Sequence, residues 1–333
     1  MHLLIGTHFA LPQARGAVMK KSTIAMSLCS FLVGVTFSSG QAWAALAGQE
    51  NTCGSGTQNR VVRLKAEEKI VDLGESITTE AWTFNGTTPG PTIEACEGDS
   101  VKIIVENKGK MAHGFDSHAF RTDPMHFGPV DPGKTMVIEN KLNAPGVFMY
   151  HCASGPVTDQ HIKMGMYGVM IVYPRNQKLK PAHEIVVSEN GVYGEPNQKG
   201  RISPSGDRMN DNRAYIVLYN GSMKHAALDV RAGDLVRVYF VNAGPYTSAF
   251  HVMGIILDKA YEGGNPRNVA SDVQTYGVPA GSGGMFEFVI PEKGTYMLVD
   301  HDKLSQIPNG LAIPIVAREA VAAKTSALSK VAH

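Results

Sequence analysis

The sequence has little of what marks membrane proteins or nucleic-acid binders. Among 333 residues only four are cysteines, and Lys plus Arg (31) nearly balances Asp plus Glu (30). This balance gives no electrostatic reason to expect a nucleic acid or a membrane surface as partner. Amphipathic helical patterns are scarce, and after the N-terminal segment no run is apolar enough to cross a bilayer. Glycine is abundant, at 35 residues, and indicates many turns.

The first 44 residues resemble a targeting segment rather than part of the fold. Met19-Lys20-Lys21 is a basic start, residues 22–37 are apolar, and Ala42-Trp43-Ala44 is a small-x-small cleavage site. A membrane anchor is the alternative, but the apolar run is shorter than a span requires. Residues 1–18 look like an upstream extension. We therefore expect a signal peptide and an exported, periplasmic chain that starts near Ala45.

From about residue 60 onward the pattern is all β. Segments such as 80–84 and 101–105 alternate or run apolar over strand lengths, and Asn85-Gly86 and Pro132-Gly133 punctuate them. Strands at this spacing predict a sandwich or Greek-key barrel. The polar stretch 190–212 predicts a long loop that is functional or mobile. We divide the chain into a signal segment (1–44), an N-terminal arm (45–59), a first β domain (60–175), a second β domain (182–317) and a C-terminal tail (318–333).

The two β domains repeat each other. GDSVKIIVEN leads to His113 in the first, and GDLVRVYFVN leads to His251 in the second. PGVFMYHC, around His151, matches KGTYMLVDH, which ends at His301. The similar order predicts a duplicated domain that retains a histidine at both matching places. The second copy has no cysteine after Cys152, so it cannot build the same thiolate site.

One cysteine, two histidines and a methionine form the strongest chemical pattern. Cys152, His161 and Met166 follow one another at the end of an apolar run, and His113 lies upstream in the same domain. Two imidazoles, a thiolate and a weak axial thioether are the ligands of an electron-transfer copper site. Met164 is the alternative axial ligand. The structural alternative is a core cysteine surrounded by hydrogen-bonded histidines.

A second metal site is predicted from histidines that the first leaves over. Because neighbouring residues of a strand point to opposite faces, His151 faces away from the metal that Cys152 faces. Three imidazoles without a thiolate suit a catalytic metal with an open position, and they would also hold zinc. A carboxylate and a free imidazole beside it suit proton delivery. The three imidazoles are His118, His151 and His301, and the proton-delivering pair is Asp116 and His251.

The remaining cysteines form one candidate disulfide. Cys29 lies in the signal segment, so only Cys53 and Cys96 remain if Cys152 binds a metal. An oxidising compartment would let them pair, whereas two unrelated buried thiols are the alternative. Such a bridge would tie the N-terminal arm to the first domain and contribute roughly 3–4 kcal/mol.

Together these segments resemble the copper-containing nitrite reductases. HGFDSHA is similar to their H-x-x-D-x-H segment, and YHCASGPVTDQHIKMGMYG is similar to their H-C-A-x₇-H-x₄-M-x-G segment. The resemblance covers roughly residues 60 to 317 and implies two tandem Greek-key cupredoxin barrels, a homotrimer, and reduction of nitrite to nitric oxide. It also implies one type 1 and one type 2 copper per chain, with a small periplasmic cytochrome c or blue-copper protein as electron donor. The implied ligands are His113, Cys152, His161 and Met166 for type 1 copper, and His118, His151 and a neighbouring chain's His301 for type 2 copper, with Asp116 and His251 flanking the substrate.

One departure and two rival functions follow from the same residues. Two residues after the catalytic histidine the family usually has an aliphatic residue over the substrate, and the resemblance therefore implies that Met253 lines the substrate pocket of this chain. A laccase-like multicopper oxidase needs paired H-x-H motifs and an H-C-H, but the chain has no H-x-H, and Ala153 follows Cys152. A non-enzymatic blue-copper electron carrier is the other rival. The retention of Asp116, His251 and His301 argues against it.

Overall fold

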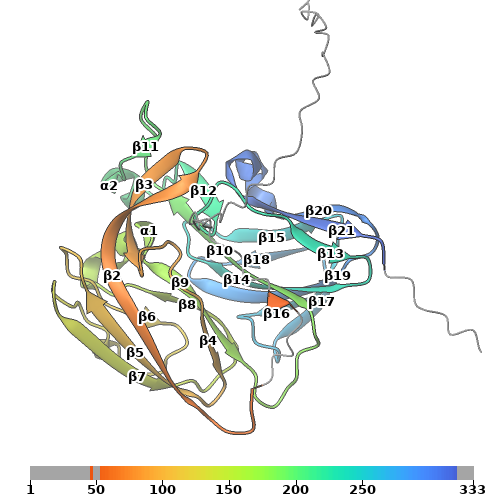
Figure 1. Ribbon diagram of the computed structural model, residues 1–333, viewed down its shortest axis with the longest axis horizontal. Helices are drawn as coiled ribbons and strands as arrows, with labels where there is room; N and C mark the ends of the chain where they lie inside the picture. Colours follow the sequence, from red (N-terminus) through yellow and green to blue (C-terminus); the bar gives the residue numbers. More distant parts are fainter. Residues whose placement is uncertain (1–45, 48–52, 321–333) are drawn as a thin grey trace, which may run out of the picture. The chain divides into compact units, whose positions relative to one another are not determined.

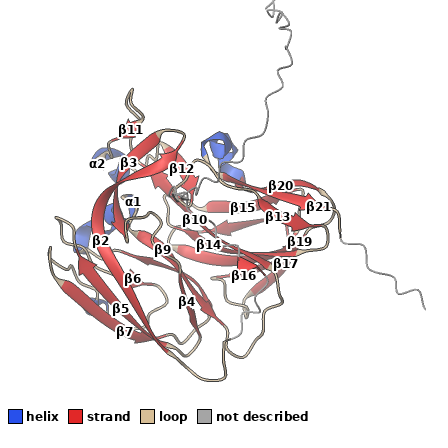
Figure 2. Ribbon diagram, viewed as in Figure 1, coloured by secondary structure: helices blue, strands red, loops and turns tan. Residues whose placement is uncertain are grey.

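The computed structural model describes residues 46–47 and 53–320, which belong to one compact unit, Trp43–His333. Strands dominate and the helices are short (Figure 2). Within the described part of the chain, no helix has the length and apolar character needed to cross a membrane. The predicted signal segment, the start near Ala45 and residues 321–333 of the predicted tail lie outside the described residues.

The first barrel pairs a five-stranded sheet, in the order β11-β3-β2-β5-β7, with a four-stranded sheet, in the order β4-β9-β8-β6 (Figure 1). Its strands alternate as half-buried strands should. In β5, Val101, Ile103 and Val105 are fully buried between more exposed neighbours. The strands are β2 (Asn59–Gly74), β3 (Ile77–Phe84), β4 (Ile93–Cys96), β5 (Ser100–Asn107), β6 (Asp116–Ser117), β7 (Thr135–Lys141), β8 (Gly146–His151), β9 (Tyr167–Tyr173) and, added at the sheet edge from later in the chain, β11 (Arg201–Ile202).

The second barrel pairs a seven-stranded sheet, β1-β10-β14-β19-β16-β17 with β12 on β10, with the five-stranded sheet β13-β21-β20-β15-β18. Each barrel mixes parallel and antiparallel pairs, and the predicted all-β fold of two tandem barrels is confirmed. The strands are β1 (Leu46–Ala47), β10 (His183–Val192), β12 (Ile216–Tyr219), β13 (Leu228–Arg231), β14 (Leu235–Asn242), β15 (Ser248–Met253), β16 (Leu257–Glu262), β17 (Val269–Val273), β18 (Thr275–Val278), β19 (Ser282–Val289), β20 (Gly294–Asp300) and β21 (Ala312–Arg318).

The ladder registers define which residues of the two barrels are equivalent. β5 and β14 both end at an asparagine, Asn107 or Asn242, whose amide donates hydrogen bonds to two backbone carbonyls. β6 pairs with β8 through Asp116↔His151, as β15 pairs with β20 through His251↔Val299. β8 and β20 both begin at a glycine, Gly146 or Gly294, so their sixth residues, His151 and Val299, are equivalent. Their ladder partners, Asp116 and His251, are then equivalent too.

These registers correct the expected match between the histidines of the two repeats. The repeat predicts that His251 is equivalent to His113. However, His251 follows Asn242 by nine residues, whereas His113 follows Asn107 by six. His301 likewise lies two residues beyond the position that matches His151. The repeated motifs identify equivalent strands, but they do not determine how many residues separate the end of a strand from the next histidine. The predicted match between the histidines was wrong for this reason. The two predicted site histidines of the second barrel, His251 and His301, therefore do not occupy the positions equivalent to His113 and His151.

The stretch 190–212 is more ordered than a loop. β10 continues to Val192, and the chain then forms β11 (Arg201–Ile202) and α2 (Gly206–Asn210). β11 pairs in parallel with β3 of the first barrel. α2 packs on α1 (Thr158–Lys163), where Lys163 Nζ donates to the carbonyl of Met209 at 2.7 Å. The second barrel thus braces the segment that carries His161.

Apolar packing joins the two barrels. All seven residues of β9 are buried, and Tyr173 of β9 lies edge-on to Tyr239 of β14, with ring centroids 5.9 Å apart. The amide of Val147 in β8 also donates to the carbonyl of Gly263 at 2.8 Å. A strand that is apolar on both faces is expected where it is covered on both sides.

Cys53 and Cys96 form a disulfide with a Cα–Cα distance of 5.8 Å. Cys96 ends β4, so the bridge attaches the segment before β2 to the first barrel. Arg175 reinforces the attachment, because its guanidinium donates to the carbonyls of Gly54 and Gly56 and to the Asp99 carboxylate. Among the described residues, the one free cysteine is Cys152.

Candidate metal centres

Three residues from three segments of the first barrel converge on one buried point. His113 precedes β6, Cys152 follows β8, and His161 lies in α1. Cys152 Sγ lies 3.2 Å from His161 Nδ1 and 3.9 Å from His113 Nδ1, and the two Nδ1 atoms are 3.2 Å apart. Exposure is 0% for His113 and Cys152 and 1% for His161. A dry cluster of one sulfur and two ring nitrogens suits a soft metal ion.

Hydrogen bonds orient two of these side chains toward the shared point. The backbone amide of Gly114 donates to Cys152 Sγ at 3.2 Å. His113 Nε2 lies 3.3 Å from Glu68 Oε1, and a carboxylate there accepts the ring N–H, which leaves the Nδ1 lone pair free. Sequence reasoning missed Glu68, because a glutamate in an alternating strand has the pattern of a solvent-facing residue.

Burial keeps this cluster uncharged when no metal is bound. It lowers the pKa of His161 to about 4, with a further contribution from His113, and it raises the pKa of the Cys152 thiol to about 12. Partial burial acts to raise the pKa of Glu68, but hydrogen bonds from the Lys110 amide and from His113 outweigh it and lower the pKa. Glu68 is therefore a carboxylate beside a neutral imidazole.

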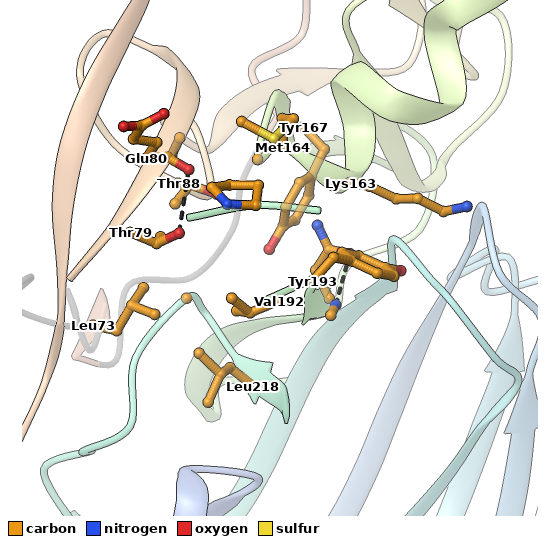
Figure 3. A pocket seen from close by; sticks show the side chains of 16 residues that line it. Leu73, Thr79, Glu80, Thr88, Lys163, Met164, Tyr167, Val192, Tyr193 and Leu218 are labelled. Atoms are coloured by element: carbon orange, nitrogen blue, oxygen red, sulfur yellow. Dashed lines mark hydrogen bonds between the residues drawn. The ribbon is translucent and has the colours of Figure 1, made fainter. Parts of the chain in front are cut away.

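The two candidate axial methionines lie in different surroundings. Met166 is fully buried in the apolar cluster that contains Cys152 and Phe115. Met164 instead packs with Tyr193 and lines a cavity of about 40 Å³ beside β3 and β10 (Figure 3). The burial pattern favours Met166 at the metal centre.

A second cluster lies on the other side of the same strand end. His118 Nε2 and His151 Nε2 are 3.1 Å apart. His151 Nδ1 is 2.9 Å from the carbonyl of Cys152, and His118 Nδ1 is 2.9 Å from the carbonyl of Gly281. Because a carbonyl only accepts, both Nδ1 atoms carry the proton and both Nε2 lone pairs face each other. Two imidazoles fixed in this way are suited to sharing a metal.

Asp116 and Gly281 complete the surroundings of this pair. Asp116 Oδ2 lies 3.9 Å from His151 Nε2, and the Asp116 side chain is partly exposed. Gly281 belongs to the second barrel and has a φ of +78°, a conformation that favours glycine. Its carbonyl sets the tautomer of His118 across the barrel interface, a role that the repeated glycines of 281–284 did not reveal in the sequence.

The other two predicted residues form a third group in the second barrel. His251 and His301 lie edge to face with ring centroids 5.1 Å apart. His251 Nδ1 lies 2.6 Å from the carbonyl of Gln274, so its Nε2 is the free ring nitrogen. His301 is exposed and begins η3 (His301–Asn309). Met253, two residues after His251 on β15, is partly buried.

The structure therefore distributes the predicted residues over three groups. Among the described residues, the only three His, Cys, Asp or Glu ligand atoms that lie within 4.8 Å of one another belong to His113, Cys152 and His161. His301 does not join His118 and His151 within one chain. The His118–His151 pair and the His251–His301 pair are separate groups within one chain.

Comparisons with known proteins show what this chain is similar to. The family model described as multicopper oxidase matches residues 65–177 and 201–321. A solved copper nitrite reductase from Nitrosomonas europaea is 34% identical, with a TM-score of 0.72 over 79% of this chain and 94% of that chain. A solved copper-containing nitrite reductase from Thermus scotoductus is 29% identical, with a TM-score of 0.72 over 78% of this chain and 62% of that chain.

A curated relative has the same description. The copper-containing nitrite reductase of Neisseria gonorrhoeae is 34% identical over 252 residues, which are 72% of this chain and 64% of that protein. This chain thus spans less than two thirds of the length of that relative.

Proposed function

Since the chain belongs to the multicopper oxidase family and, within it, to the copper-containing nitrite reductases, we propose that it reduces nitrite to nitric oxide. One electron and two protons convert one nitrite into one nitric oxide and one water, and one N–O bond breaks. The observation that carries this proposal is the adjacency of Cys152 and His151. Each lies in a different metal-ligating cluster, and one peptide bond joins them.

Both ligand sets fit copper. His113, Cys152, His161 and Met166 offer the two imidazoles, thiolate and thioether of a type 1 site. His118 and His151 offer two free Nε2 lone pairs for a type 2 site, and His301 of a neighbouring chain would supply the third. When bound, copper in the first site takes up and passes on one electron, and copper in the second acts as a Lewis acid toward nitrite.

The chain between the two sites is a short covalent path. Cys152 follows directly after β8, whose last residue is His151, so the two side chains leave the backbone on opposite sides. The carbonyl of Cys152 also accepts the Nδ1 proton of His151. An electron that enters at the thiolate can therefore reach His151 by two short routes. One is the covalent backbone of the dipeptide, and the other is the hydrogen bond between His151 Nδ1 and the Cys152 carbonyl.

Asp116 and His251 would hold the two protons. Asp116 lies beside His151 without belonging to the paired imidazoles, and its side chain is partly open to solvent. His251 presents Nε2, since its Nδ1 is engaged by Gln274. In an assembled site, Asp116 would lie on one side of the departing oxygen and His251 on the other, and each would deliver one proton. Met253 would line the same pocket and set the orientation of nitrite.

The assembly that completes the site is a homotrimer. The two half-sites of a single chain lie in separate barrels, and each lacks what the other offers. A closed ring of identical contacts would place the His251–His301 pair of one chain on the His118–His151 pair of the next. We further propose that the chain works in the periplasm after export, with a small cytochrome c or blue-copper protein as donor.

Electron paramagnetic resonance of the copper-loaded protein, with and without nitrite, tests this function. Type 1 and type 2 signals in equal amounts, of which nitrite shifts only the type 2 signal, are expected. A type 1 signal alone, at one copper per chain and unchanged by nitrite, would make the protein an electron carrier and sink the proposal.

A further inference from the structure

A cluster of charged side chains is buried in the second barrel at the start of η3. Asp300 and Glu189 are both 0% exposed. The ammonium of Lys303 contacts the Asp300 carboxylate and lies 3.4 Å from Glu189 Oε1. It also donates to the carbonyl of Thr247 at 3.1 Å and lies 5.9 Å from the centre of the Tyr246 ring. Charges this deep are rare unless they are paired, and the proposed reaction does not use them.

The ladder registers place this cluster where the first barrel has its thiolate centre. Asp300 takes the position of Cys152, because Asp300 directly follows Val299 and Cys152 directly follows the equivalent residue, His151. Ser248 takes the position of His113, since each is the sixth residue after the equivalent asparagines that end β14 and β5. Two of the four type 1 positions thus have polar counterparts in the second barrel.

The hydrogen bonds of the two centres correspond as well. In the first barrel the amide of Gly114 donates to Cys152 Sγ at 3.2 Å. In the second, the equivalent amide of Ala249 donates to Asp300 Oδ1 at 3.1 Å. Lys303 follows Asp300 in the connection to the next strand, just as His161 follows Cys152. The second centre has a carboxylate where the first has the Cys152 thiol, keeps the backbone donor and adds a cationic side chain.

We propose that the Lys303 ammonium takes the place of a metal ion in the second barrel, and that with Asp300 it clamps β15 to the start of η3. The clamp would position His251 and His301, whose roles rest on the proposed function. It differs from the first centre in that its cation is part of the chain and is present from folding onward.

Asp300 makes the contacts that a clamp requires. Its Oδ1 accepts from Ala249, two residues before His251, and from the amide of Asp302 at 2.9 Å, one residue after His301. One carboxylate thus fixes both backbone segments that carry the two histidines. Lys303 contacts the other oxygen of the same carboxylate.

Glu189 adds no second negative charge near neutral pH. Burial and the neighbouring Asp300 carboxylate raise the pKa of Glu189 to about 8. Ser248 Oγ donates to Glu189 Oε2 at 2.7 Å. The charges are therefore one carboxylate and one ammonium, which compensate each other.

Lys303→Met in the full-length, copper-free protein tests the clamp. Amide hydrogen exchange in peptides covering 247–253 and 299–306 should accelerate at least tenfold, because the buried carboxylate loses its counter-charge. Lys293→Met is the matched control, since that side chain is 64% exposed and lies just before β20. The proposal is wrong if the two variants exchange alike.

The double variant Lys303→Met/Asp300→Asn separates charge compensation from packing. The amide oxygen still accepts from both backbone donors and no charge is left unpaired, so exchange should return to within about threefold of the wild type. Should Lys303→Met not fold, a folded double variant supports the clamp. A double variant that exchanges as fast as the single one, or that does not fold, overturns it.

Copper loading connects the clamp to the proposed function. In Lys303→Met the affinity for type 2 copper should fall at least tenfold, while the type 1 optical spectrum stays unchanged. Unchanged type 2 affinity despite faster exchange would show that the clamp does not position the histidines. A wild-type protein without a type 2 signal would instead sink the proposed function and leave the exchange experiment as the test of the clamp.

Discussion

Asp116 is the residue whose substitution most directly separates proton delivery from metal binding. Its carboxylate lies 3.9 Å from His151 Nε2 but outside the pair of imidazoles that would hold copper. Asp116→Asn keeps the shape but replaces the ionisable carboxyl by an amide that cannot deliver a proton, so nitrite turnover should fall about 100-fold or more while both coppers remain bound. Stopped-flow or steady-state rates together with copper analysis measure this.

Asp131→Asn is a suitable control, because Asp131 is an exposed turn residue of the same barrel. It should leave turnover unchanged. Near-normal turnover in Asp116→Asn, or loss of copper from it, would contradict the assigned role.

Glu189 makes stability depend on pH in a defined direction. Its pKa of about 8 in the folded protein is above the usual value of 4.5, so between these values the folded chain holds a proton that the unfolded chain has released. Its contribution to stability is therefore complete below pH 4.5 and is lost as the pH rises toward 8. Asp300 and Lys303 face this carboxyl and oppose each other in setting the pKa.

Glu189→Gln imitates the protonated acid and should remove this dependence. The melting temperature of the variant minus that of the wild type should increase from pH 5 to pH 8 and then level off. Glu292→Gln, at an exposed position, should give a constant difference. A constant difference for Glu189→Gln as well would mean that this carboxyl does not titrate as described.

At the scale of elements, the sequence predicts a strand well where one face of the strand is buried. It predicts less well where contacts with distant segments determine whether a segment is a strand, a helix or a loop. The predicted segment 101–105 lies within β5, and alternation reveals it. α1 has only six residues, and its neighbour α2 reaches it from the other barrel. No local pattern encodes such a contact, so the stretch 190–212 appeared to be a loop.

The residues of the candidate site also differ in how well the sequence predicts them. The group of His113, Cys152 and His161 could be predicted, because a cysteine, a histidine and a methionine at short spacing point to one metal. The contribution of Gly281 could not be predicted, because a carbonyl oxygen leaves no trace in the sequence. The second-barrel cluster was missed for another reason: an aspartate and a lysine three residues apart have the pattern of a solvated helix face, yet Asp300 is fully buried.

The disulfide gives a prediction at the same scale. Cys53 and Cys96 are separated by 43 residues, and closing a loop of that size removes roughly 3–4 kcal/mol of unfolded-state entropy. Cys53→Ser/Cys96→Ser should lower the free energy of unfolding by about that amount and leave the type 1 optical spectrum intact. Denaturant unfolding measures the loss. Equal stability, or free thiols at both positions in the wild-type protein, would contradict the prediction.

At the scale of the whole molecule, the proposed function makes activity a property of the assembly, because the two histidine pairs lie in different barrels. His118 and His151 belong to the first barrel, and His301 belongs to the second. If His301 acts on a neighbouring chain, His301→Ala and His118→Ala should each be inactive and each keep the blue type 1 site. Their defects lie in different chains of the same shared site.

Mixed trimers decide whether the site is shared. When the two variants are co-expressed in equal amounts and assemble at random, about a quarter of the sites combine an intact His118 from one chain with an intact His301 from the next. Type 2 copper and nitrite turnover should recover to about that fraction. The double variant His118→Ala/His301→Ala, co-expressed with either single variant, should recover nothing, since no interface then holds both histidines. Recovery of activity in mixed trimers would therefore mean that the electron path lies within one chain and that two chains supply the ligands of the type 2 site. If no activity is recovered, His301 belongs to the site of its own chain.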